Sequence, residues 1–280
     1  MINITSRIIV VLIISTATIF SAWGQKTITN SIGMELILIA PGNMMVGEFK
    51  PPYVVPEDTV KDAKHPIIMA MGEGRGYSTR EFELARQMAT ADSKPGFKVA
   101  IKRPYYIGKY EVTQGQWKKV MGSNPSTFKS DDTDDLPVES ITWDQAQAFV
   151  AALNKMEKTR RYRLPTEFEW EYAARSGRTG DIPWPEIQKS ANLNKKTTLR
   201  VGEMAPNAWG LYDVLGNVWE WVEDYYNEKM FADPVPKKNG NQHVLKGASF
   251  TGDVKNATYM THAAGPGNGW DIGLRILMEK

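Results

Sequence analysis

Few side chains in this sequence are suited to covalent chemistry. Cysteine is absent, which excludes disulfides, thiolate metal sites and thiol nucleophiles. Ser249 has no neighbouring base along the chain, so its hydroxyl group lacks the partner that an activated nucleophile needs. His262 lies in the same region and is a candidate acid or base, although such a histidine is more often a solvated surface residue. Any chemistry must therefore use oxygen and nitrogen groups.

Metal ligands of the ordinary kinds are equally sparse. The other histidines, His65 and His243, are far along the chain from His262 and from each other, so no histidine spacing indicates a metal site. Residues 131–135 have the sequence Asp-Asp-Thr-Asp-Asp and can attract a cation, but a run of this kind is usually a solvated turn.

The composition is that of a folded globular domain. The 280 residues are 42% hydrophobic and 24% charged, with a formal net charge of +2, and this rules out wholesale disorder. A charge so close to zero creates no strong field to hold a polyanion. Nucleic acid is therefore not an expected partner.

The N-terminus has the features of a secretory signal peptide. Residues 1–24 hold one cation, then an apolar run that ends near Phe20, then small residues up to Gly24. Because about 20 apolar residues are needed to span a bilayer, this shorter run predicts cleavage near Gly24 rather than a permanent anchor. We expect a periplasmic or secreted protein with no permanent membrane span, in which residues 25–280 form one domain.

Local patterns predict helices that begin after three threonines. Thr113, Thr142 and Thr166 are placed to accept hydrogen bonds from the first helical turn. Gln145 and Glu169 follow the last two threonines by three residues and complete capping boxes. Beyond Thr142, apolar residues recur at the spacing of one buried helical face, namely Ala146, Phe149, Val150 and Leu153.

Strands are predicted from short apolar runs, and a long segment interrupts them. The runs are 34–39, with 44–47 as its hairpin partner, 105–112, 161–164, 244–246 and 274–278. From residue 177 onward, Gly, Asn, Asp, Pro and Trp dominate and predict loops. Residues 50–103 are broken up by proline and glycine, so we interpret about 50–103 as a surface insertion.

Short motifs follow one another in order through the second half of the chain. They include Tyr-Arg-Leu-Pro-Thr-Glu at 162–167, Gly-Asn-Val-Trp-Glu-Trp at 216–221 and Ile-Gly-Leu-Arg at 272–275, with others at 106–113, 136–143, 170–175, 207–213 and 246–250. These motifs resemble the formylglycine-generating-enzyme family, also called the sulfatase-modifying-factor domain. The resemblance covers about 28–48 and 104–278 and implies an irregular, loop-rich α+β fold related to C-type lectins.

The resemblance does not extend to the oxidase chemistry. In the copper-dependent members, two cysteines follow the segment that resembles 246–250, and those positions here are Gly252 and Ala257. Neither residue can bind copper, so no copper is expected, and the chain resembles a pseudoenzyme. Trp219 and Ser249 match residues of the family's pocket, which can persist without its metal. The iron-dependent sulfoxide synthases of the family are also disfavoured because their histidine-rich motif is absent.

The resemblance also implies structural calcium. Asp213, Gly216, Val218 and Glu220 match a calcium site of the family, in which two carboxylates and two backbone carbonyl groups would supply the oxygen ligands that calcium prefers. The alternative is that the two carboxylates only accept hydrogen bonds from loop N–H groups. A second family site begins at Asn192 and Leu193, but its remaining ligands are not identifiable here.

Three tryptophans add a possible binding surface. Trp209, Trp219 and Trp221 could line a groove for an extended peptide or a sugar, although such residues more often pack in a core; Trp219 is the exception that the family places in its pocket. The expected function is that of an exported accessory or scaffold protein that binds a partner protein or peptide. The alternative is a periplasmic enzyme that uses the same pocket for a cysteine-free oxidation or maturation of a peptide-derived metabolite.

Overall fold

The computed structural model describes residues 26–47, 96–129, 132–180, 182–252, 257–265, 267 and 269–280. The predicted signal peptide, most of the predicted insertion and Asp131 lie outside these residues. Within the described part, no helix is long and apolar enough to cross a membrane.

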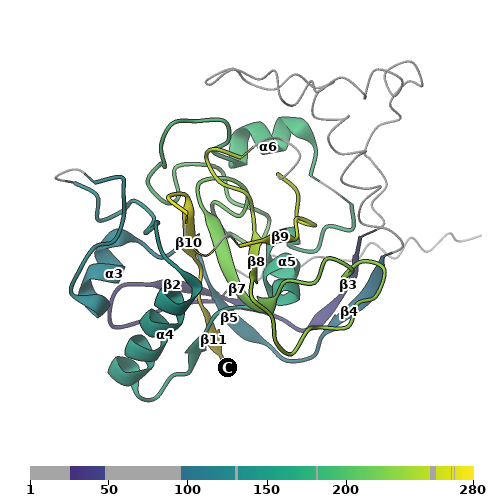
Figure 1. The fold of residues 1–280 in the computed structure, drawn as a ribbon, viewed down its shortest axis with the longest axis horizontal. Helices are drawn as coiled ribbons and strands as arrows, with labels where there is room; N and C mark the ends of the chain where they lie inside the picture. The colour runs from purple at the N-terminus through teal and green to yellow at the C-terminus, as the bar shows by residue number, and fades with distance from the viewer. Residues whose placement is uncertain are drawn as a thin grey trace, which may run out of the picture.

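A five-stranded sheet carries the N-terminal and C-terminal strands of the domain (Figure 1). All of its neighbouring strands run antiparallel. Its order is β1 (Thr27–Thr29), β2 (Glu35–Ile39), β5 (Tyr105–Gly108), β11 (Leu277–Glu279) and β6 (Tyr162–Arg163). The predicted strand at 105–112 is therefore shorter than expected, and the predicted strand at 274–278 is divided between two sheets.

The predicted hairpin between 34–39 and 44–47 is wrong. Both edges of β2 are already occupied, by β1 on one side and β5 on the other, so no edge is left for the next strand. That strand, β3 (Gly42–Val46), pairs instead with β4 (Phe97–Ile101) in an antiparallel two-stranded sheet. The last residues of the predicted insertion thus form a strand, and Figure 1 shows β3 and β4 on the side opposite to α3 and α4.

A four-stranded sheet lies at the centre of the molecule and positions the candidate site. Its order is β10 (Ile272–Leu274), β7 (Trp219–Tyr225), β8 (His243–Lys246) and β9 (Ala263–Ala264). Only the β10 and β7 pair is parallel, with Ile272 opposite Trp219. β7 lies in the part of the chain where loops were predicted.

The capped helices are confirmed. α3 (Gln114–Met121), α4 (Trp143–Glu157) and α5 (Glu167–Arg175) begin directly after the three threonines, and each start is a capping box. The apolar face predicted for α4 is buried, and Phe149 stacks on Trp117 of α3 with ring centroids 5.0 Å apart. One further helix, α6 (Trp184–Ser190), was not predicted. Few helices and several small sheets make up the irregular α+β fold that was expected.

Candidate functional site

Ser249 lies in a tight turn that directly follows β8. Gly247 and Ala248 both adopt the left-handed backbone region, with φ of 90° and 64°. A side chain at Gly247 would approach the Trp170 ring and the Val214 carbonyl group to 3.1 Å, so glycine is required there. The N–H group of Phe250 donates to the Asn217 carbonyl group at 2.9 Å and fixes the far side of the turn.

Asp271 brings the two hydroxyl groups of this turn together. Its Oδ2 atom accepts hydrogen bonds from Ser249 Oγ at 2.6 Å and from Thr251 Oγ1 at 2.8 Å. The Asp271 carbonyl group accepts the Trp219 N–H group at 2.9 Å, so the pairing of β10 with β7 sets its position. We call Ser249, Thr251 and Asp271, with Trp219 and Trp270, the Ser249 cluster. Asp271 and Thr251 were not predicted as site residues.

Aromatic rings form one wall of the Ser249 cluster. Trp270 is 50% exposed, which is unusual for so large an apolar side chain. Its ring lies 5.3 Å from that of Phe250 and 5.8 Å from that of Phe128. Trp219 is half-buried at the start of β7. Within the described residues, Asp271 Oδ1 has no hydrogen-bond partner, and the exposed indole ring belongs to the residue directly before Asp271 in the chain.

The two positions where the copper-dependent members carry cysteine cannot form a copper site. Gly252 donates its N–H group to the Ser249 carbonyl group at 2.8 Å, and a Cβ atom at this position would lie only 2.9 Å from that same oxygen. Ala257 is fully buried. The turn therefore has no thiolate ligands for copper. At Gly252 it also has no space for a cysteine side chain.

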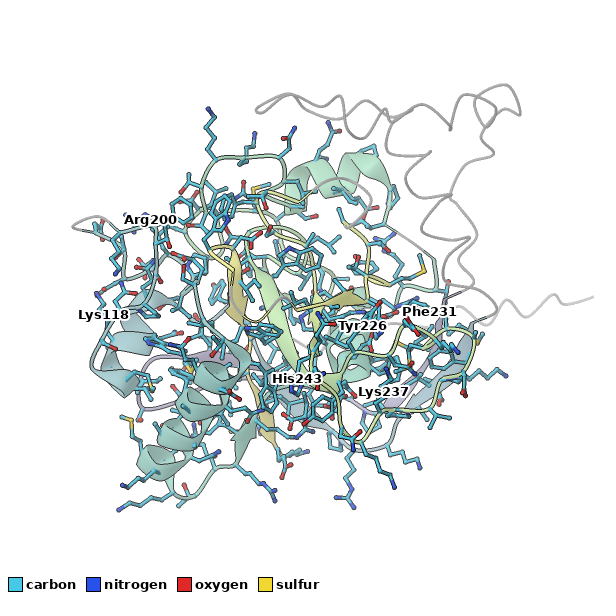
Figure 2. All side chains as sticks on the ribbon, in the orientation of Figure 1. Lys118, Arg200, Tyr226, Phe231, Lys237 and His243 are labelled. Carbon is cyan, nitrogen blue, oxygen red and sulfur yellow. The ribbon has the colours of Figure 1, made fainter. Side chains whose placement is uncertain are left out.

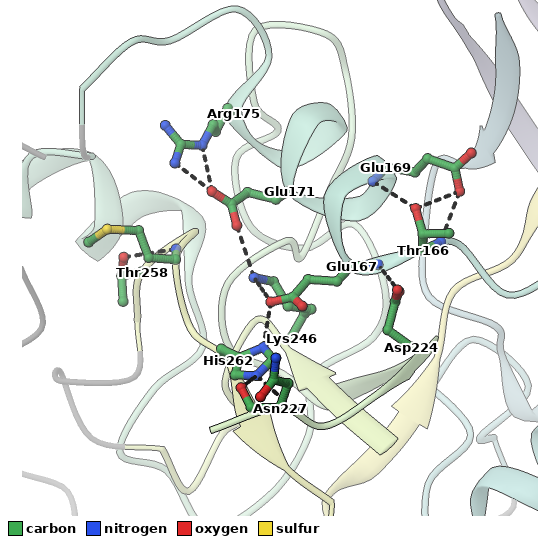
Figure 3. A network of polar contacts seen from close by, with 11 residues as sticks. Thr166, Glu167, Glu169, Glu171, Arg175, Asp224, Asn227, Lys246, Thr258 and His262 are labelled. Atoms are coloured by element: carbon green, nitrogen blue, oxygen red, sulfur yellow. Dashed lines mark hydrogen bonds and ion pairs between the residues drawn. The ribbon is translucent and has the colours of Figure 1, made fainter. Parts of the chain in front are cut away.

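His262 is not the solvated surface residue that was considered the more common case. Its side chain is 4% exposed, Nδ1 lies 2.7 Å from Glu167 Oε1, and Nε2 lies 2.8 Å from the Asn227 carbonyl oxygen (Figure 3). Tyr226 stacks on the imidazole ring with centroids 4.8 Å apart. Both ring nitrogens are thus engaged away from Ser249, and the structure does not bring these two predicted residues together as a catalytic pair.

The His262 contact belongs to a buried ionic network at the start of α5. Lys246 lies 3.0 Å from Glu171 and 3.5 Å from Glu167, and Glu171 also binds Arg175, as Figure 3 shows. Burial alone would raise the pKa of Glu167, but the Lys246 ammonium group and His262 outweigh that effect and lower it. The network pairs each carboxylate with a cation and therefore serves to fix α5 on β8.

A second buried cluster holds the predicted calcium residues. Glu111, Asp213 and Glu220 surround one guanidinium group, that of Arg275, and all four side chains are nearly inaccessible. Burial raises the pKa of Glu111 well above its usual value, and the charges of Asp213 and Glu220 raise it further. Burial likewise raises the pKa of Asp213 to about 6. Three carboxyl groups thus share one guanidinium group, and the raised pKa values of Glu111 and Asp213 favour their protonated forms.

Glu220 does not fit as a calcium ligand in this arrangement. Its oxygens accept from Arg275 Nε and Nη2 at 2.8–3.1 Å and from Trp170 Nε1 at 2.6 Å. These bonds occupy the lone pairs that a carboxylate offers. Asp213 accepts one hydrogen bond, from the Gly202 N–H group at 2.7 Å, which is the structural role considered as the alternative.

Buried side-chain oxygens that accept no hydrogen bond from the described residues lie at the second predicted calcium site. Asn192 is 2% exposed, and its Oδ1 atom has no hydrogen-bond partner in the described part of the chain. Thr198 Oγ1, on the same loop, is also buried without a partner. Asn192 pairs with Gly216, where an added Cβ atom would lie 2.4 Å from the Asn192 carbonyl oxygen. The oxygens of this loop are therefore better suited to bind calcium than those of Glu220. The described part of the chain contains no group of three or more acidic or histidine side chains that could hold a metal ion.

The described acids of the acidic segment 131–135 form surface ion pairs. Asp134 binds Lys118, and Arg200 binds Asp132 at 2.6 Å and Asp135 at 3.5 Å. Figure 2 shows Lys118 and Arg200 on the same side of the molecule. The described acids of this segment thus already have cationic partners.

The other two tryptophans of the predicted groove pack with the hydrophobic core, Trp221 fully buried and Trp209 partly buried. Trp221 is 1% exposed and donates Nε1–H to the Ile141 carbonyl group at 3.0 Å. Trp209 packs edge-on against Tyr172 with centroids 5.2 Å apart. Of the three tryptophans, only Trp219 borders the Ser249 cluster.

The chain is similar to curated proteins with different names. The chaperone protein LppX of Paenibacillus barcinonensis is 30% identical over 238 residues, which cover 63% of this chain and 80% of that protein. The formylglycine-generating enzyme of Thermomonospora curvata is 31% identical over 179 residues, which cover 54% of this chain and 55% of the enzyme. The chain therefore spans about half of that enzyme's length.

Solved structures share the fold at lower sequence identity. Treponema denticola variable protein 1 superposes with a TM-score of 0.69 at 24% identity and covers 91% of this chain and 99% of its own. PvdO from Pseudomonas aeruginosa superposes with a TM-score of 0.68 at 22% identity and covers 92% of this chain and 99% of its own. The family model described as the sulfatase-modifying factor enzyme 1-like domain matches residues 32–280. The chain belongs to this family.

Proposed function

We propose that this protein is an exported accessory protein that binds a partner protein or peptide through the Ser249 cluster. The observations that carry the proposal are the Oδ1 atom of Asp271, which has no hydrogen-bond partner among the described residues, and the ring of the preceding residue, Trp270, which is 50% exposed. A carboxylate accepts charge-assisted hydrogen bonds, and an exposed indole ring attracts cations over its face. The cluster is therefore suited to a lysine or arginine side chain of a partner.

Local geometry supports a binding role over copper oxidation. The Ser249 turn offers no thiolate, and a side chain at Gly252 would collide with the Ser249 carbonyl group. Ser249 itself is fully buried, so its hydroxyl group orients Asp271 instead of facing a substrate. The name of the LppX relative, a chaperone, is compatible with an accessory role. The alternative, a cysteine-free oxidase or maturation enzyme, requires a bound redox metal or cofactor.

We propose two further properties. Residues 1–24 direct export and are removed, which N-terminal sequencing of the protein from its native host would test. Calcium stabilises the domain through the Asn192 loop and Asp213 rather than through Glu220. The support is the buried Oδ1 atom of Asn192, which has no partner among the described residues, and the group of three carboxyl side chains around Arg275.

The binding role is tested with synthetic peptides and two variants. Pentapeptides that contain arginine or lysine should bind the mature protein more tightly than their neutral counterparts, as measured by calorimetry. Asp271→Asn and Trp270→Ala should each weaken binding about tenfold, the loss expected for one charge-assisted contact. Val235→Ala is the matched control because Val235 is an exposed apolar residue, 63% accessible, on another loop.

Two results would contradict the proposal. If all variants bound charged and neutral peptides equally well, the Ser249 cluster would not be the binding site. Stoichiometric copper or iron in protein from the native host, or conversion of a sulfatase-motif cysteine to an aldehyde above a buffer control, would establish the enzyme instead.

A further inference from the structure

A second cavity, separate from the Ser249 cluster, lies between the β3–β4 pair and the end of α5. It has a volume of about 570 Å³, within the usual range for small-molecule sites. We call it the Tyr172 cavity. Its walls include Met44, Lys98, Tyr172, Arg175, Arg178 and Thr179. It shares no residue with the Ser249 cluster.

The charges that line the Tyr172 cavity have one sign. Lys98, Arg175 and Arg178 are cationic, and none of the described lining residues is acidic. Lys98 makes no ion pair with any described residue. Arg178 pairs with Glu186 at 2.5 Å, but both side chains are substantially exposed, and such surface pairs are weak. Lys98 and Arg178 therefore present positive charge to the cavity, whereas the charge of Arg175 is paired with Glu171.

The guanidinium group of Arg175 is held in place by hydrogen bonds to Glu171, which is not itself a lining residue of the cavity. Arg175 is 2% exposed, and Glu171 Oε1 accepts hydrogen bonds from its Nε and Nη2 atoms at 2.9 and 2.5 Å. Because Glu171 is fixed in turn by Lys246, the guanidinium group is oriented before any ligand arrives. Preorganisation of this kind lowers the entropic cost of binding.

Tyr172 adds a neutral donor. It is only 9% exposed, and its hydroxyl group makes no hydrogen bond with any described residue. Burial raises the pKa of this hydroxyl group, so it stays protonated and can donate. Tyr172 Oη lies directly over Gly42, where a Cβ atom would be 2.1 Å away. The phenol is therefore confined by the backbone of Gly42, the first residue of β3.

We propose that the Tyr172 cavity binds a small organic oxyanion, in which a phosphate or carboxylate group is joined to an apolar part. Lys98, Arg178 and the Tyr172 hydroxyl group contact the anion. Met44 and the Tyr172 ring contact the apolar part. The negative end of the α5 dipole opposes an anion here, so the attraction for the anion must come from Lys98 and Arg178.

The test uses the mature protein and three probes: phenyl phosphate, phenylacetate and inorganic phosphate. Calorimetry at low ionic strength should show binding of at least one aromatic anion, more tightly than inorganic phosphate, and weaker as salt is added. The tighter of phenyl phosphate and phenylacetate identifies the anionic group. Lys98→Ala, Arg178→Ala and Tyr172→Phe should each weaken binding of that probe about tenfold, the loss expected for one bond to a charged ligand.

The controls separate binding from folding. Lys155→Ala removes an exposed lysine of α4, on the side of the molecule opposite to β3 and β4 (Figure 1), and should bind like the wild type. Tyr172→Phe should melt at the wild-type temperature because its hydroxyl group has no partner to lose. The proposal is overturned if neither aromatic anion binds, if inorganic phosphate binds as tightly as they do, or if Lys98→Ala behaves like Lys155→Ala.

Discussion

Replacement of Arg275 by methionine should destabilise the domain more than any surface change. The side chain is 1% exposed. It donates to Glu220 at 2.8 Å, to the Gly108 carbonyl group at 3.0 Å and to the Tyr212 carbonyl group at 2.8 Å. One guanidinium group thus joins β5, the loop before Asp213, and β7.

The expected loss follows from what remains after the change. Methionine approximates the length of the arginine stem, so lost packing contributes little. Glu220, Glu111 and Asp213 stay buried without their shared cation, and breaking a buried ion pair by removing one partner destabilises a protein by about 3–5 kcal/mol. With about 4 kcal/mol, and a shift of about 2–4 °C for each kcal/mol in a domain of this size, Tm should fall by about 8–16 °C.

Thermal melting at neutral pH measures this loss, and two variants control it. Arg161→Met breaks a contact with Glu279 in which the arginine side chain is 78% exposed and 3.5 Å away, so it should change stability by at most about 0.5 kcal/mol. Adding Glu220→Gln to Arg275→Met should recover part of the loss because one unpaired charge is removed. If Arg275→Met melted within about 2 °C of the wild type, the buried cluster would not hold the sheets together as argued.

Two further predictions concern the same cluster. Burial raises the pKa of Asp213 from its ordinary 3.8 to about 6, so the folded state keeps a proton that the unfolded state releases, and this stabilisation is lost as pH rises through about 4 to 6. Over this pH range the unfolding free energy of Asp213→Asn should therefore fall less than that of the wild type. Equal dependence of the unfolding free energy on pH in both proteins would contradict the raised pKa of Asp213. Removing calcium from calcium-loaded protein with a chelator should lower Tm, because a ligand of the native state stabilises it by about 2.7 kcal/mol at a hundredfold excess over Kd. Asp213→Asn should lose most of this decrease in Tm. An unchanged Tm of the wild type in excess chelator would contradict the proposal that calcium stabilises the domain.

The helices were predictable because their signals are local. A threonine and a glutamine or glutamate three residues later satisfy the first N–H groups of a helix wherever the rest of the chain goes. The buried face of α4 follows from the same short segment through its spacing. These features need no knowledge of distant residues, and all three capped helices begin where the sequence predicts.

The strands and the Ser249 cluster were harder because their partners are distant. β7 was missed since its surroundings are rich in turn residues, and its parallel partner β10 lies about fifty residues further along the chain. The contact of Ser249 with Asp271 crosses 22 residues. The only sequence signal for Asp271 was its place directly before the motif at 272–275. The burial of His262 depends equally on long-range contacts, with Glu167 95 residues away.

Asp271 determines what the Ser249 cluster can do chemically. Its Oδ2 atom accepts from both hydroxyl groups, so their hydrogens are directed at the carboxylate and away from any ligand. The buried Ser249 oxygen cannot reach a substrate, and neither imidazole nitrogen of His262 is free to take its proton. The outward-facing groups of the cluster are therefore a carboxylate oxygen and indole surface. These groups are suited to recognising a cation, which is why we propose a binding function for this domain.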